Sequence, residues 1–138
     1  LPMPFLAPGD LFKAGLPEDG ITLTNPLHAE ESVLRTSLLP GQLKAIAYNQ
    51  SHRTPDVRFF EIDHVFLPAP VGQLLPDERE YLAVALTGAE APAAVEVLDV
   101  LDRALALPNE GFTTPKQIPK AKEVRYTALA VPTLSIRG

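Results

Sequence analysis

The chain has 138 residues, no cysteine and a net charge of −5 at neutral pH, and 46% of its residues are hydrophobic. The length fits one domain with a sizeable core, and the lack of cysteine excludes a disulfide framework and fits a cytoplasmic origin. The acidic balance argues against a free-standing nucleic-acid-binding protein, because phosphate contacts need a concentrated basic surface. No apolar run approaches the roughly 18 to 20 residues of a membrane span.

Prolines and glycines break up the first part of the chain. Residues 1–20 predict a linker that leads into the domain and contains one short helical turn. Asp10 is placed to cap that turn, and Gly15 suits its left-handed end. Residues 21–26 alternate apolar and polar side chains, which is the period of a β-strand.

The next segment, residues 38–49, predicts a helix. Ser37 is a suitable N-cap residue, and Pro40 is tolerated only in the first turn of a helix. An apolar stripe at helical spacing supports the prediction, and it consists of Leu39, Leu43, Ile46 and Ala47.

The strongest predicted strand runs from Val57 to Phe66. It is rich in Val, Ile and Phe, and prolines lie on both sides of it. Alternation places Glu61 and Asp63 on one face and Phe60 on the other. Since both faces carry large apolar groups, we expect this strand to be covered on both sides and central in its sheet.

Three more elements are predicted after this strand. A charged loop over residues 75–80 leads into a second strand that ends near Gly88. Residues 90–107 predict a helix with an apolar stripe, and residues 124–131 predict a last strand. The mixture of elements predicts an α+β fold in which an antiparallel β-sheet is flanked by helices.

Short catalytic signatures do not occur in the sequence: it has no glycine-rich phosphate loop, nucleophile elbow or zinc-protease motif. Glu61 and Asp63 share one face of their predicted strand. Paired carboxylates can bind Mg²⁺ or transfer protons. A strand face turned toward solvent is the simpler interpretation of the same pair, and we favour it.

Arg35 stands beside Thr36 at the start of the predicted helix. Backbone N–H groups at a helix start, together with an arginine, can bind an anion. The alternative is a forked ion pair with a carboxylate of the same chain, for which the candidates are Glu30, Glu31 and Glu61. We expect the carboxylate pair.

Three motifs follow one another between residues 24 and 88. They read TNPLHAEESVLRTSLLPGQLKAIAYNQ, VRFFEIDHVF and LPDEREYLAVALTG. In their order and separation they resemble the core domain of the bacterial phenylalanyl-tRNA synthetase β subunit. The resemblance implies a class II aminoacyl-tRNA synthetase-like fold over residues 21–107. Residues 108–138 do not follow the family pattern, and we expect an incomplete or diverged C-terminal segment there.

The same resemblance implies a domain that is not itself catalytic. In this family the α subunit carries the site for ATP and phenylalanine, and the β core supports the assembly with α. In catalytic class II domains an arginine that holds the ATP α-phosphate follows the strand that residues 57–66 resemble. Here Leu67 and Pro68 follow Phe66, and neither can neutralise phosphate charge.

The implied function is assembly with the α subunit of a cytoplasmic enzyme that charges tRNA-Phe with phenylalanine. We expect no cofactor on this domain, with ATP and Mg²⁺ used by the whole enzyme and tRNA bound only in that context. In this interpretation Arg35, Thr36, Leu39 and Leu43 either contact the other subunit or fix the turn before the helix.

Two other functions remain open at this point. One is a stand-alone class II-like adenylating enzyme, in which Arg35 and Arg58 bind phosphate while Glu61 and Asp63 bind Mg²⁺. The other is a small acidic protein-binding module without a link to synthetases.

Overall fold

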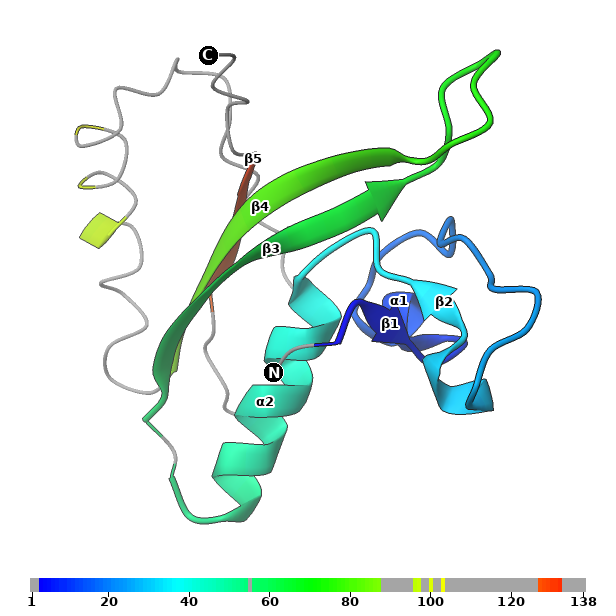
Figure 1. The fold of residues 1–138 in the computed structure, drawn as a ribbon. Helices are drawn as coiled ribbons and strands as arrows, with labels where there is room; N and C mark the ends of the chain where they lie inside the picture. Colours follow the sequence, from blue (N-terminus) through cyan, green and yellow to red (C-terminus); the bar gives the residue numbers. More distant parts are fainter. Residues whose placement is uncertain are drawn as a thin grey trace.

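A computed structural model describes residues 3–54, 56–87, 96–97, 100, 103 and 127–132. Its main feature is an antiparallel sheet of three strands in the order β3-β4-β5 (Figure 1). These strands are β3 (Arg58–Leu67), β4 (Asp77–Leu86) and β5 (Thr127–Pro132). A second antiparallel sheet joins β1 (Phe5–Leu6) to β2 (Val33–Leu34). The expected α+β fold with antiparallel sheets and flanking helix is confirmed.

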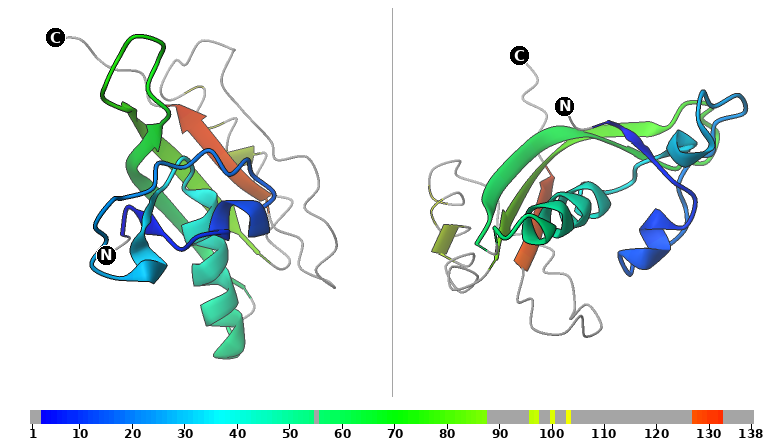
Figure 2. Two further views of the ribbon diagram at one scale, coloured as in Figure 1. Left: turned by 90° about the vertical axis from the view of Figure 1, so that its right-hand side faces the viewer. Right: turned by 90° about the horizontal axis from the view of Figure 1, so that it is seen from below.

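The main helix, α2 (Leu39–Ser51), lies against one face of the β3–β4 ribbon, and Figure 2 shows it below the concave side of the strands. Leu38, just before α2, is fully buried and packs against Val65 of β3 and Ala83 of β4. Two short helices precede α2, namely α1 (Asp10–Lys13) and the 3-10 helix η1 (Ala29–Glu31). None of the helices in the described part of the chain is long and apolar enough to span a membrane.

The two long strands β3 and β4 pair over their whole length, from Arg58 opposite Leu86 to Leu67 opposite Asp77. Because side chains alternate along a strand, β3 has two different faces. The inner face, which meets α2, carries Phe59, Glu61, Asp63 and Val65. The outer face carries Arg58, Phe60, Ile62 and His64.

The prediction that β3 is central and covered on both sides is wrong for the described sheet. β3 is an edge strand that has β4 as its only neighbouring strand there. On its outer face Phe60 is 69% exposed and Ile62 is 53% exposed. Apolar composition shows that a face is suited to burial, but it does not identify the partner that covers it.

The β3–β4 hairpin is longer than predicted. Residues 77–80, expected to lie in a charged loop, form the start of β4 and pair with the end of β3. Their charged side chains lie where the hairpin extends beyond α2, so charge and strand structure are compatible there. The predicted strand 21–26 is wrong, since only Thr22 forms an isolated bridge, to Val33.

The predicted helix at residues 38–49 is confirmed as α2. The last strand, predicted at residues 124–131, is confirmed as β5 over residues 127–131, and residues 124–126 lie outside the described residues. Ser37 does not occupy the N-cap position, which Leu38 takes, but its Oγ accepts a hydrogen bond from the Leu39 N–H. The predicted helix 90–107 falls mostly outside the described residues; those described within it, 96–97, 100 and 103, are helical.

The first twenty residues, predicted as a linker, contribute β1 and α1 to the packed structure. Asp10 is the first residue of α1 and not its cap, because Gly9 holds the cap position. Gly15 has the expected left-handed backbone, with φ of +74°.

Candidate functional site

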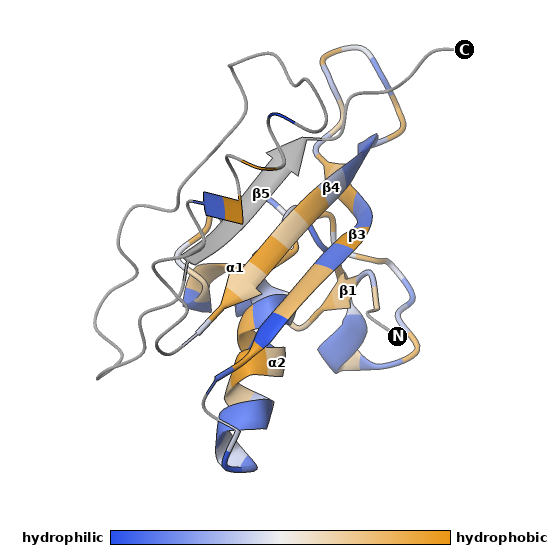
Figure 3. Cartoon of the chain, turned by 90° about the vertical axis from the view of Figure 1, so that its left-hand side faces the viewer, coloured by the Kyte–Doolittle hydropathy of each residue, from blue (hydrophilic) through white to orange (hydrophobic). Residues whose placement is uncertain are grey.

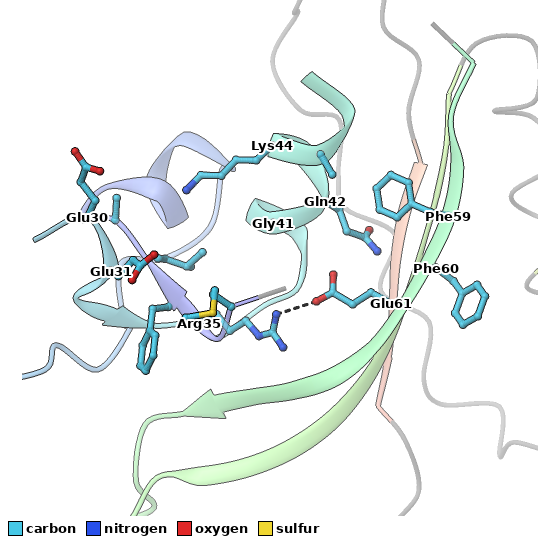
Figure 4. Close-up of a pocket in the computed structure, with 14 residues that line it drawn as sticks. Glu30, Glu31, Arg35, Gly41, Gln42, Lys44, Phe59, Phe60 and Glu61 are labelled. Atoms are coloured by element: carbon cyan, nitrogen blue, oxygen red, sulfur yellow. Dashed lines mark hydrogen bonds and ion pairs between the residues drawn. The ribbon is translucent and has the colours of Figure 1, made fainter. Parts of the chain in front are cut away.

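Arg35 lies between β2 and α2 and is only 3% exposed. Its guanidinium reaches the inner face of β3. Nη1 donates to Glu61 Oε1 at 2.8 Å, Nη2 lies 2.7 Å from Asp63 Oδ2, and Nε donates to the His64 carbonyl at 2.8 Å. Figure 4 shows the pair with Glu61. The expected carboxylate pair is therefore confirmed for Glu61, and Asp63 is a second partner.

The backbone of Arg35 also joins separate segments. Its N–H donates to the Pro4 carbonyl at 3.0 Å, and its own carbonyl accepts from the Phe66 N–H at 2.9 Å. Since β3 is the edge of the described sheet, the bond with Phe66 occupies part of its open edge. Arg35 thus connects the N-terminal segment, the start of α2 and β3. We call Arg35, Glu61 and Asp63 the arginine clamp.

The pKa values of the two carboxylates in the arginine clamp shift in opposite directions. Burial raises the pKa of Glu61, and the opposing attraction of Arg35 does not offset that effect. Burial also acts to raise the pKa of Asp63, but hydrogen bonds from Arg35 and the His64 N–H outweigh it and lower that pKa. One guanidinium faces two carboxylates, so the clamp carries a net negative charge when both are ionised.

Glu61→Gln tests the raised pKa. A carboxyl group with a raised folded-state pKa binds its proton more tightly in the folded than in the unfolded state. It therefore stabilises the fold at pH values below its ordinary pKa of 4.5, and this contribution is lost as the pH rises through the folded-state pKa. The glutamine lacks this titration but can still accept a hydrogen bond from Arg35. We therefore expect the stability of the variant, relative to wild type, to increase as pH rises from 4.5.

Urea unfolding of both chains, followed by circular dichroism between about pH 4 and pH 7, measures this difference. The raised pKa would be contradicted if the difference in unfolding free energy between variant and wild type stayed constant over this range. It would also be contradicted if the variant became less stable relative to wild type as the pH rises.

A cavity of about 880 Å³ adjoins the arginine clamp between α2, β3 and the N-terminal segment. Arg35 and Glu61 line it together with Gln42 of α2, which is 1% exposed. In Figure 4 the Gln42 side chain points from α2 toward β3 and Glu61. Sequence reasoning missed Gln42. The available signal was a polar residue between Leu38 and Ile46, at the spacing of the buried helix stripe.

A second ion pair joins α1 to α2. The buried Asp10 accepts from Lys44 Nζ at 2.6 Å and from the Ala7 N–H at 2.9 Å. Burial acts to raise the pKa of Asp10, but its bonds with Lys44 and Ala7 outweigh that effect and lower it. This pair holds α1 against α2, and its Lys44 also lines the cavity.

The other residues predicted for the turn or the interface are largely inside the fold. Thr36 is buried and makes a long hydrogen bond, 3.4 Å from its Oγ1 to Asp19 Oδ1. Leu39 is buried against Ala14, and the half-buried Leu43 packs beside them. Their apolar contacts hold α1 against α2.

The structure brings together only some of the residues that were considered as phosphate and Mg²⁺ ligands of an adenylating enzyme. Arg35, Glu61 and Asp63 meet, but the arginine itself engages both carboxylates. Arg58 lies on the outer face of β3, opposite to this cluster. Among the described residues no group of three histidine, cysteine or acidic side chains could hold a metal ion.

Comparison with known proteins identifies relatives of this chain. The family model for the phenylalanyl tRNA synthetase beta chain CLM domain matches residues 1–103. The phenylalanine–tRNA ligase beta subunit of Geobacter sulfurreducens is 44% identical over 93 residues, which are 64% of this chain and 12% of that protein. The beta subunit of Symbiobacterium thermophilum is 42% identical over 82 residues, 56% of this chain and 9% of that protein.

The chain thus spans about a tenth of the length of the curated relatives it matches. Among solved structures, the pyrrolysyl tRNA synthetase PylSc of Desulfitobacterium hafniense is similar, with a TM-score of 0.63 and 13% identity. That match covers 96% of this chain and 56% of the PylSc chain. At this identity the likeness shows a shared fold and nothing about activity.

Proposed function

The chain belongs to the family of phenylalanyl-tRNA synthetase β-chain CLM domains, and from this premise we propose that it is a noncatalytic domain that assembles with the α subunit of the synthetase. In this proposal the α subunit carries out the ATP-dependent charging of tRNA-Phe, and this domain gives it structural support. The observation that carries the proposal is the arginine clamp, whose groups bind one another instead of a substrate.

A nucleotide site needs a cation that is available to phosphate. Each nitrogen of the Arg35 guanidinium already lies against an oxygen of β3. The residues after β3 start with Pro68, so the arginine expected there in a catalytic domain is missing. We propose that ATP and Mg²⁺ bind elsewhere in the complete enzyme, and we expect no ATP–pyrophosphate exchange with phenylalanine from this chain alone.

The buried positions of Arg35, Thr36 and Leu39 support a turn-fixing role for them rather than contact with another subunit. An apolar surface does exist on the outer face of β3, where Phe60 and Ile62 are exposed. Figure 3 shows that hydrophobic residues recur along β3 and β4. Since large exposed apolar residues side by side on one strand face are suited to a protein partner, we propose this face as the contact surface for the α subunit.

Phe60→Asp tests both the partner and the surface. We expect wild-type chain to bind a bacterial phenylalanyl-tRNA synthetase α subunit at micromolar concentrations in calorimetric titration, and the variant to bind about tenfold more weakly or worse, because it places a charge in an apolar contact. Leu74→Asp is the matched control, since Leu74 is 100% exposed at the hairpin tip, away from that face.

The control variant is expected to bind as the wild type does. No heat of binding from the wild-type chain at micromolar concentration would contradict the assembly function. Equal affinity of the Phe60→Asp variant and the wild type would contradict the contact surface and leave the assembly function standing.

A further inference from the structure

Gln42 is a buried amide without a hydrogen-bonding partner. Neither its Nε2 nor its Oε1 is bonded within the described part of the chain, although the residue is 1% exposed. It lines the cavity beside the arginine clamp, and its side chain points toward Glu61 and Phe59 (Figure 4). A buried amide in this state lowers the stability of the fold, and a bound group that pairs with it would offset that cost.

The charges around the cavity disfavour the binding of an anion. Glu30, Glu31 and Glu61 line it, whereas its cations are Arg35 and Lys44. Both cations are engaged, Arg35 by the clamp and Lys44 by Asp10. An entering carboxylate or phosphate would meet uncompensated negative charge in a partly dehydrated space.

The two unbonded atoms of Gln42 indicate which hydrogen-bonding groups a ligand of the cavity must carry. Its Nε2 requires an acceptor and its Oε1 requires a donor. An ammonium group supplies donors only, and a carboxylate supplies acceptors only. A carboxamide supplies both in one plane and can form two reciprocal hydrogen bonds with the Gln42 amide.

The cavity also has apolar walls, to which Met3, Phe5 and Phe59 contribute. Such a combination of apolar lining and a few polar groups is typical of a small-molecule site. We propose that this cavity, which we call the Gln42 cavity, binds a small neutral carboxamide whose hydrocarbon part lies against these walls. The proposal does not depend on assembly with an α subunit.

Three probes of nearly equal shape test the proposal on the 138-residue chain. They are benzamide, benzylamine and benzoate, which differ in charge and in hydrogen-bonding groups. Amide NMR spectra should show saturable shifts of the Gln42 side-chain NH₂ signals with benzamide, at a dissociation constant in the millimolar range for so small a ligand. Benzylamine is expected to bind several-fold more weakly, and benzoate to cause no saturable shift.

Gln42→Met should remove the benzamide response, weakening the binding about tenfold or more. Gln50→Met is the matched control, because it makes the same substitution on α2 at a residue that does not line the cavity. A further measurement uses the wild-type chain alone, so its result does not depend on whether a variant folds. Nuclear Overhauser contacts are expected between the benzamide ring and the side chains of Met3 and Phe59.

Any of three results would overturn the proposal. One is the absence of saturable shifts with benzamide up to about 20 mM, which would mean that the cavity holds water only. The second is an equal response to all three probes, and the third is a set of contacts from the benzamide ring to residues outside the cavity.

Discussion

Arg35→Met is expected to lower the free energy of unfolding by about 3–5 kcal/mol. Methionine keeps much of the length of the side chain but leaves Glu61 and Asp63 facing each other on the inner face of β3 without their shared cation. It also removes the hydrogen bond to the His64 carbonyl. Urea unfolding at neutral pH, followed by circular dichroism, measures the loss.

Arg79→Met is the matched control for this experiment. Arg79 also pairs with an aspartate, Asp77, but its side chain is about half exposed. An exposed pair contributes about 0–1 kcal/mol, so this variant should retain nearly all of the stability. If both arginine variants lost the same small amount, the arginine clamp would have no special structural role.

A second substitution in the clamp shows whether the Arg35→Met variant loses stability through unpaired charges or through poorer packing. In the Arg35→Met background, Glu61→Gln removes one of the two unpaired charges, so part of the lost stability should return. If the double variant is as unstable as Arg35→Met or less stable, the loss results from packing rather than from unpaired charge.

Leu38→Ala is expected to lower the free energy of unfolding by about 2–5 kcal/mol. Leu38 is 0% exposed and fills the space between the start of α2, Val65 and Ala83, so a truncated side chain leaves a cavity at the junction of helix and sheet. Thermal and urea unfolding of the variant at neutral pH measure the effect.

Leu74→Ala makes the same chemical change at a residue that is 100% exposed. It should alter the free energy of unfolding by no more than about 0.5 kcal/mol. A Leu38→Ala variant that is as stable as this control would mean that α2 does not pack on the inner face of β3 and β4.

Local sequence patterns were sufficient to predict the elements that carry the clamp. Helical spacing of apolar residues predicted α2, and the β-branched and aromatic run predicted β3. The alternation of that strand put Glu61 and Asp63 on one face, but the expectation that this face meets solvent was wrong, because it meets Arg35. Glu61 was one of three candidate carboxylates for Arg35, beside Glu30 and Glu31. The predictions of α2, of β3 and of its alternation succeeded because each depends on neighbours along one element. The choice of Glu61 as a partner depends instead on how β3 packs against the segment that carries Arg35.

The predictions that failed depended on tertiary neighbours. The apolar outer face of β3 suggested a central strand, but strand order is set by pairing between distant segments. The Gln42 cavity has walls from Met3, α2 and β3, so nothing within one element indicates it. The position of Gln42 on the apolar stripe of α2 was the one local sign of a polar group inside the fold.

Size-exclusion chromatography with light scattering tests the central claim most directly, on this chain alone and after mixing with a bacterial phenylalanyl-tRNA synthetase α subunit. Assembly predicts one species whose mass contains both chains in equal number, and Phe60→Asp should reduce its amount. Two separate peaks, each with the mass of its component alone while this chain stays folded, would contradict the assembly function.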